Sequence, residues 1–169
     1  MAVTLKNEKV VDNWSMIVKE GQGKVEEVFK DTESFILKSE APGVKSERVK
    51  ANPGFLAGVF GSERTFIRVV NKDLKRYEMY IGVRAYGKNL DLSWYLTYEP
   101  GLIARIIAIV TSRLFPGRAW VPTLNLFQQQ DLTAYATVVH HCFLDSIEKI
   151  TKGTGQDIDR KSRGFLGIS

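Results

Sequence analysis

Three consecutive segments between residues 65 and 98 alternate between apolar and polar side chains, and this pattern limits the fold more than any other feature of the chain. Their apolar sets are Thr65, Ile67 and Val69, then Tyr77, Met79, Ile81, Val83 and Ala85, and finally Leu90, Leu92, Trp94, Leu96 and Tyr98. The connections between them, at residues 71–73 and 87–89, have the residue types of hairpin turns. Because successive side chains of a strand point to opposite faces, the segments predict an antiparallel meander with one buried face.

The part of the chain before the meander carries a helical pattern. Its apolar stripe contains Val10, Val11, Trp14, Ile17, Val18, Gly21, Val25, Val28 and Phe29. The stripe keeps a helical phase throughout, so it predicts one helix over residues 7–31, in which Gly21 would let a neighbouring element approach closely. Two short helices joined at the glycines are the alternative. Residues 33–39 and 46–51 are predicted as two further strands, separated by a turn at Pro42 and Gly43.

Two helices are predicted after the meander. Residues 102–115 are apolar around most of the helical circumference, which is typical of a buried helix, or of an interface where the helix is not covered. Residues 128–151 form an amphipathic pattern with an apolar stripe of Leu132, Tyr135, Val139, Cys142, Phe143, Ile147 and Ile150. Residues 154–169 are predicted to be a flexible polar and basic tail.

The order of these elements defines the fold class. Strands grouped in the middle, with helices at both ends, are typical of α+β proteins. We therefore expect a single α+β domain over residues 1–153. In it, an antiparallel meander sheet of four to six strands packs one face against an N-terminal helix and two C-terminal helices. A chain of 169 residues with 44% hydrophobic and 25% charged residues has the composition of one such domain.

The sequence also bears on the cellular compartment. The single cysteine, Cys142, cannot form an internal disulfide, and the first residues lack the apolar core of a signal peptide. The longest apolar run, at residues 102–110, is interrupted by Arg105 and is shorter than the roughly 20 residues of a membrane-spanning helix. These features predict a cytoplasmic protein without a transmembrane segment.

Residues that often carry catalysis or bind metals are few. His140 and His141 are neighbours on a predicted helix, so their side chains diverge by about 100°. His141, Asp145 and Glu148 share one helix face; this spacing could hold a divalent cation and is equally typical of a solvated face with local ion pairs. Cys142 lies on the apolar stripe and is predicted to be a core residue. We expect no cofactor, metal or catalytic site, and the sequence favours a non-enzymatic role while leaving catalysis open.

The polar face of the meander offers the candidate binding residues. With the apolar sets turned inward, the other face carries arginines interleaved with tyrosines, and the candidates are Arg68, Arg76, Tyr80, Arg84, Tyr86 and Tyr95. Such a surface suits a protein interface, because arginine and tyrosine are enriched there. It also suits nucleic acid, since aromatic rings stack on bases and arginines neutralise phosphates. The third interpretation is an exposed face stabilised by cross-strand pairs of Arg with Glu and of Tyr with Arg.

These observations favour a non-enzymatic binding or assembly module that associates with itself or with another protein, through the Arg/Tyr face or the apolar helix at residues 102–115. A net charge of +5, from 24 Lys and Arg against 19 Asp and Glu, makes nucleic acid the less favoured partner. A further alternative is a hydrophobic small molecule held between the sheet and the long helix. That cavity would be lined by Met79, Ile81, Trp94, Leu96, Tyr135 and Phe143.

Overall fold

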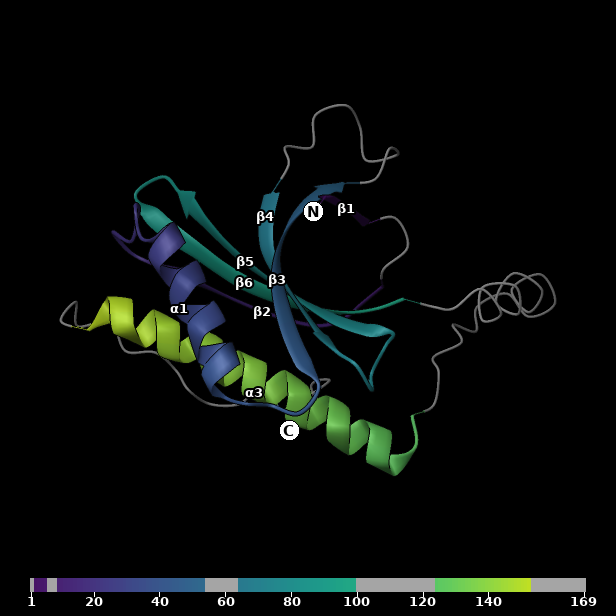
Figure 1. Cartoon of the computed structure of the whole chain (residues 1–169). Helices are drawn as coiled ribbons and strands as arrows, with labels where there is room; N and C mark the ends of the chain where they lie inside the picture. The colour runs from purple at the N-terminus through teal and green to yellow at the C-terminus, as the bar shows by residue number, and fades with distance from the viewer. Residues whose placement is uncertain (1, 6–8, 54–63, 100–123, 153–169) are drawn as a thin grey trace.

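A computed structural model describes residues 2–5, 9–53, 64–99 and 124–152, and they form an α+β fold of one sheet and two helices (Figure 1). The strands are β1 (Ala2–Leu5), β2 (Lys9–Val18), β3 (Val44–Pro53), β4 (Arg64–Asn71), β5 (Tyr77–Tyr86) and β6 (Asn89–Tyr98). The helices are α1 (Val25–Lys38) and α3 (Leu126–Thr151). The sheet order is β1-β3-β4-β5-β6-β2, and every neighbouring pair is antiparallel except β1 and β3.

The two edges of the sheet are joined by a short piece of chain. β1 is one edge strand and β2 is the other, yet only residues 6–8 separate them in sequence. From Leu5 to Lys9 a fully extended chain reaches about 14 Å. Six strands in a flat sheet would place the edges about 24 Å apart. The sheet must therefore curl, in agreement with the strong twist visible in Figure 1.

Both described helices lie on the same side of the sheet, where the alternating apolar side chains meet the apolar sides of α1 and α3 (Figure 1). Side chains with no exposed surface in this layer include Ile67, Met79, Ile81, Leu92 and Leu96 from the sheet, and Val28, Val139, Phe143, Leu144 and Ile147 from the helices. The predicted stripe of the long helix is confirmed in full apart from Ile150, which is partly buried.

Polar contacts fix the helices in place. The Thr32 and Ser146 hydroxyls are 2.8 Å apart and join α1 to α3 inside the core. Arg48 of β3 binds the carboxylates of Glu26 and Glu33, which anchors α1 to the sheet. The start of α3 is set by Asn125, whose side chain accepts a hydrogen bond from the backbone N–H of the third helical residue in a capping box.

The prediction of one helix over residues 7–31 is wrong, because its first part is strand β2 and only its last part is helical. A β-bulge between Val10 and Asp12 explains the error. The extra residue interrupts the alternation of period two, so that Val10, Val11 and Trp14 imitate a helical spacing. Gly21 nevertheless allows a close approach, since a Cβ built on it would lie 2.9 Å from the Cβ of Leu90.

The other predicted elements have mixed outcomes. Residues 33–39 are not a strand but the end of α1, in which Ile36 continues the buried helical face. The strand predicted at 46–51 is confirmed within β3, as are the meander and the helix at 128–151. The helix predicted at 102–115 and the tail at 154–169 lie outside the described residues. Among the residues that are described, no helix is long and apolar enough to cross a membrane.

Candidate functional site

The candidate residues come together in a row across the face of the sheet that points away from the helices. In register, the row runs through Asn13 of β2, Tyr95 of β6, Tyr80 of β5, Arg68 of β4 and Glu47 of β3. Three of the six predicted binding residues therefore stand side by side on what we call the outer face. The sequence predicts the side of each strand but not this register, which depends on the two hairpin turns.

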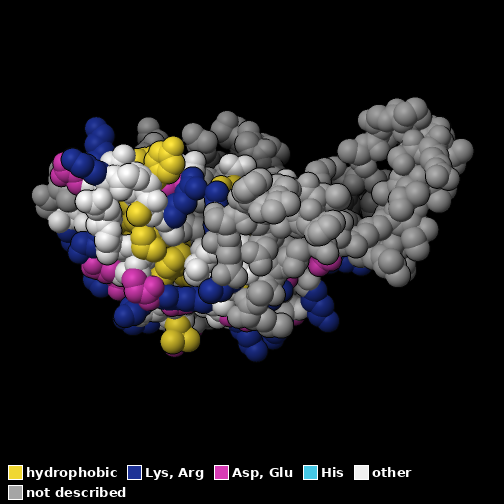
Figure 2. All heavy atoms as spheres, turned by 90° about the horizontal axis from the view of Figure 1, so that it is seen from above, with side chains coloured by type: hydrophobic (Ala, Val, Ile, Leu, Met, Phe, Trp, Pro, Cys, Tyr) yellow, Lys and Arg dark blue, Asp and Glu magenta, His cyan; other side chains and the backbone are white. Residues whose placement is uncertain are grey.

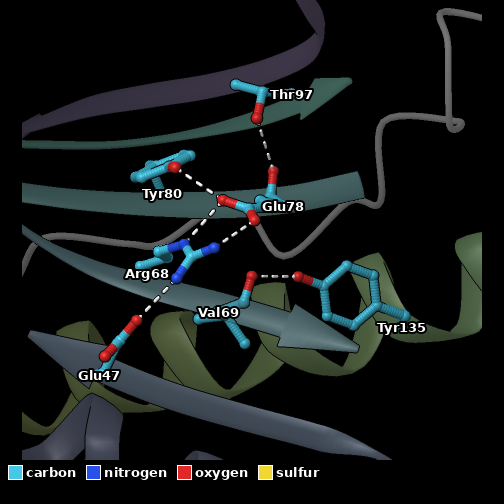
Figure 3. Close-up of polar contacts among 7 residues, drawn as sticks. All are labelled: Glu47, Arg68, Val69, Glu78, Tyr80, Thr97 and Tyr135. Atoms are coloured by element: carbon cyan, nitrogen blue, oxygen red, sulfur yellow. Dashed lines mark hydrogen bonds and ion pairs between the residues drawn. The ribbon is translucent and has the colours of Figure 1, made fainter. Parts of the chain in front are cut away.

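Arg68 is the centre of an ion-pair network on the outer face (Figure 3). Its Nε donates to Glu78 Oε2 at 2.7 Å, its Nη2 donates to the other Glu78 oxygen, and its Nη1 donates to Glu47 Oε1 at 2.8 Å. The Tyr80 hydroxyl also donates to Glu78 Oε2, at 2.7 Å. The Arg68 and Glu78 side chains are 27% and 18% exposed. The positive charge of Arg68 is thus neutralised by its own neighbours.

The network changes the acidity of Glu78. Burial opposes ionisation of this carboxyl group, but the hydrogen bonds from Arg68 and Tyr80 and the positive charge of Arg68 outweigh it, so the pKa of Glu78 is below its ordinary value. The hydrogen bonds to Glu78 in turn raise the pKa of Arg68. Glu78 is therefore ionised at neutral pH and is a structural partner of Arg68 rather than a proton donor.

An aromatic side chain fills the neighbouring part of the outer face. Gly82 leaves space over β5, and the Phe66 ring occupies it, since a Cβ on Gly82 would lie 2.8 Å from a ring carbon. The Phe66 ring meets the Tyr80 ring edge to face, with centroids 6.3 Å apart. Tyr80 is only 2% exposed. Of the predicted tyrosines, Tyr80 is therefore a packing residue and not a free stacking surface.

Arg84 and Tyr86 occupy the end of the outer face near the β5–β6 turn. Arg84 Nε donates to Asp91 Oδ2 at 2.6 Å, and its guanidinium lies 5.5 Å from the centre of the Tyr86 ring. In the register of the sheet, Asp91 lies directly opposite Ile17 of β2. Tyr86 is 65% exposed, so its ring remains accessible beside an arginine whose charge is already balanced.

Apolar side chains on β2 and β6 are exposed next to these pairs. Ile17, Val10 and Tyr95 are 50%, 48% and 37% exposed, and all three project from the outer face. Between them the small side chains of Ser15 and Ser93 lie opposite each other, so these apolar side chains are not separated by a bulky residue. Figure 2, which views the molecule of Figure 1 from above, shows hydrophobic side chains among basic and acidic ones on that side of the molecule.

Arg76 is the one candidate that lies apart from the outer face. It precedes β5 and lines a cavity of about 330 Å³ at the end of the sheet, together with side chains from β6 and from the start of α3. A second cavity of about 240 Å³ lies beside it, between the β4–β5 turn and the middle of α3, and Tyr135 lines it. The six residues predicted to enclose a ligand between sheet and helix are each less than 10% exposed, and only Tyr135 lines either cavity.

Sequence reasoning missed a cluster of aromatic rings beneath the sheet. The Trp94 Nε1–H donates to His140 Nδ1 at 2.9 Å, and the Trp14 ring meets the His140 ring edge to face, with centroids 5.3 Å apart. Burial, with a smaller contribution from the charge of His141, lowers the pKa of His140 to about 4. His140 is therefore neutral at pH 7 and accepts a hydrogen bond. Only the pairing of β2 with β6 brings the two tryptophans together.

The remaining candidates for chemistry do not come together as a site in the part of the chain that the structure describes. Within the described ranges, no three His, Cys, Asp or Glu side chains are placed so that they could hold a metal ion. Cys142 is 7% exposed, and burial raises the pKa of its thiol, so it is a core residue as predicted. Comparison of the sequence with models of protein families and with curated proteins gave no match.

Proposed function

We propose that this protein is a non-enzymatic assembly module that forms a homodimer through the outer face of its sheet, over β2 and the adjoining parts of β5 and β6. The observation that carries this proposal is the exposure of Ile17, Val10 and Tyr95 on one face of β2 and β6. Apolar and aromatic side chains contribute most of the binding energy at the centre of protein interfaces.

The charges beside this surface favour a second copy as the partner. Arg84 is paired with Asp91, and Arg68 with Glu78 and Glu47, so the face carries both signs in balance. Two copies related by a two-fold axis can therefore meet without like-charge repulsion, and the same patch serves both. The same pairing weakens the nucleic-acid alternative, because each phosphate contact would require an arginine to leave its carboxylate.

The oligomeric state measured by light scattering tests the proposal. We expect the wild-type chain to have twice the mass of a monomer at about 10 µM, a concentration at which interfaces of ordinary size are populated. Ile17→Lys should give a monomer. The new lysine faces Asp91 across the strands, so the fold keeps a favourable pair, but two lysines would meet in the dimer.

Leu37→Lys is the matched control. Leu37 is 80% exposed on α1, on the opposite side of the molecule from the outer face, so the same substitution there should leave the dimer intact. Circular dichroism checks that both variants fold. A monomeric wild-type chain at about 100 µM, or a dimer that survives Ile17→Lys, would refute self-association through this face.

A further inference from the structure

The cavity at the end of the sheet has the features of a small-molecule site that is independent of the outer face. Its volume of about 330 Å³ is at the lower end of the ~300–1,000 Å³ of ligand pockets. Its floor is formed by the buried side chains of Leu74, Tyr77 and Tyr98, with Leu124 beside them. The centroids of the Tyr77 and Tyr98 rings are 5.1 Å apart, so the floor of the cavity contains two adjacent aromatic rings.

The rim of the cavity is polar and carries a net positive charge. Lys75 and Arg76 from the β4–β5 turn line it, together with Asp73 and with Gln128 of α3. Within the described part of the chain, the Arg76 guanidinium has no carboxylate partner, in contrast to Arg48, Arg68 and Arg84. Gln128 belongs to the first turn of α3, where the helix dipole adds positive potential. One positive charge therefore remains in excess over Asp73.

The Tyr98 hydroxyl is the second observation that points to a ligand. Tyr98 is 6% exposed and lines the cavity, and its buried hydroxyl oxygen has no hydrogen-bond partner among the residues that the structure describes. A buried polar group without a partner destabilises a fold by about 1–3 kcal/mol, so its presence needs a reason. A ligand that accepts a hydrogen bond from this hydroxyl would supply one.

We infer that this cavity binds a small organic anion with a flat apolar body and a single anionic head group. The body would lie against Tyr77 and Tyr98, and the head group would accept hydrogen bonds from Arg76 and from the Tyr98 hydroxyl. A single head group fits better than a polyphosphate, since Asp73 shares the rim and would repel additional negative charge. The carboxylate and the phosphate monoester share this chemistry.

Titration of the full chain by two-dimensional amide NMR tests the inference with three probes: benzoate, phenyl phosphate and the uncharged benzamide. We expect saturable shifts at the amides of Arg76, Tyr77 and Tyr98 with one of the two anions, with a Kd of about 1 mM, as for small fragments. The anion that binds more tightly identifies the head group. Benzamide should bind at least about tenfold more weakly, because it lacks the charge.

Two variants and a control separate binding from folding. Arg76→Gln and Tyr98→Phe should each weaken binding by about tenfold, the effect of one hydrogen bond to a charged group. Lys30→Gln removes the same charge from an exposed position on α1 and should leave the Kd unchanged. Tyr98→Phe should also keep or raise the melting temperature of the free protein, since no described residue bonds to the lost hydroxyl.

The inference fails if neither anion shifts these amides at about 20 mM, or if Arg76→Gln binds as tightly as the wild type. Both outcomes are independent of the oligomeric state, because none of the lining residues belongs to the outer-face surface over β2 and β6.

Discussion

Acidification should destabilise this protein through His140, and the size of the effect can be worked out from its surroundings. His140 accepts a hydrogen bond from Trp94 and lies against Trp14, and the pKa of its imidazole is lowered from 6.5 to about 4. In the unfolded chain the pKa returns to about 6.5, so the unfolded state binds a proton first. The contribution of neutral His140 to stability is therefore complete above pH 6.5 and is lost as the pH falls toward 4.

A pKa lowered from 6.5 to about 4 would correspond to about 3.4 kcal/mol, at about 1.36 kcal/mol for a tenfold change in proton affinity. Because His140 is only partly buried, solvent screening reduces this figure, and we expect a loss of about 1–2 kcal/mol between pH 7.5 and pH 4.5. Urea unfolding followed by tryptophan fluorescence measures it directly, since Trp14 and Trp94 both contact the imidazole.

The variant His140→Gln isolates this contribution from the titration of carboxylates. Glutamine offers an oxygen acceptor to Trp94 and does not titrate, so its loss of stability between pH 7.5 and 4.5 should be smaller than that of the wild type by about 1–2 kcal/mol. His141→Gln, at the exposed neighbouring position, should lose slightly less stability than the wild type and clearly more than His140→Gln, because it removes only the smaller cause of the lowered His140 pKa. Equal losses in the wild type and in His140→Gln would refute the assignment of the acid sensitivity to His140.

Three further predictions follow from side chains described above. Glu78→Gln should lower the free energy of unfolding by about 2 kcal/mol, because the partly buried Arg68 loses its main partner. The additional change Arg68→Met should recover part of this loss, and a double-mutant cycle that shows no coupling between the two residues would contradict the prediction. Phe143→Ala should lower the free energy of unfolding by about 3–5 kcal/mol, whereas Phe127→Ala should lower it by less than about 0.5 kcal/mol, because Phe127 is 74% exposed. Similar urea midpoints for the two variants would exclude a core role for Phe143. Cys142 should react with iodoacetamide at pH 8 far more slowly in the native protein than in urea, and equal rates would show that the thiol is accessible.

The meander could be predicted from the sequence because its information is local. Each of the strands β4, β5 and β6 alternates regularly, and short turns after Asn71 and Tyr86 join them. Strand β2 could not be predicted in the same way, since a bulge breaks its alternation and its partner β6 lies far along the chain. The error at residues 33–39 has a different cause, because seven residues are too few to separate period two from a helical period.

The candidate site was predicted only as a set of side chains on one face. Arg68, Tyr80 and Tyr95 do share that face, but their burial and their partners depend on the register between strands. Arg76 has the correct parity and still lies elsewhere, since β5 begins one residue later. The contact of His140 with two tryptophans joins α3 to β2 and β6, and no local pattern contains that information.

The pairing of β2 with β6 also has a consequence for how the chain folds. Lys9 pairs with Tyr98, so the strand that the ribosome makes early has no partner until the last residues of the meander have emerged. Contacts so distant in sequence slow the search for the native state, and we expect β3 to β6 to form before the sheet is completed. Until then Trp14 is without Trp94 and His140, and the newly made chain exposes to chaperones a tryptophan that the folded protein partly buries.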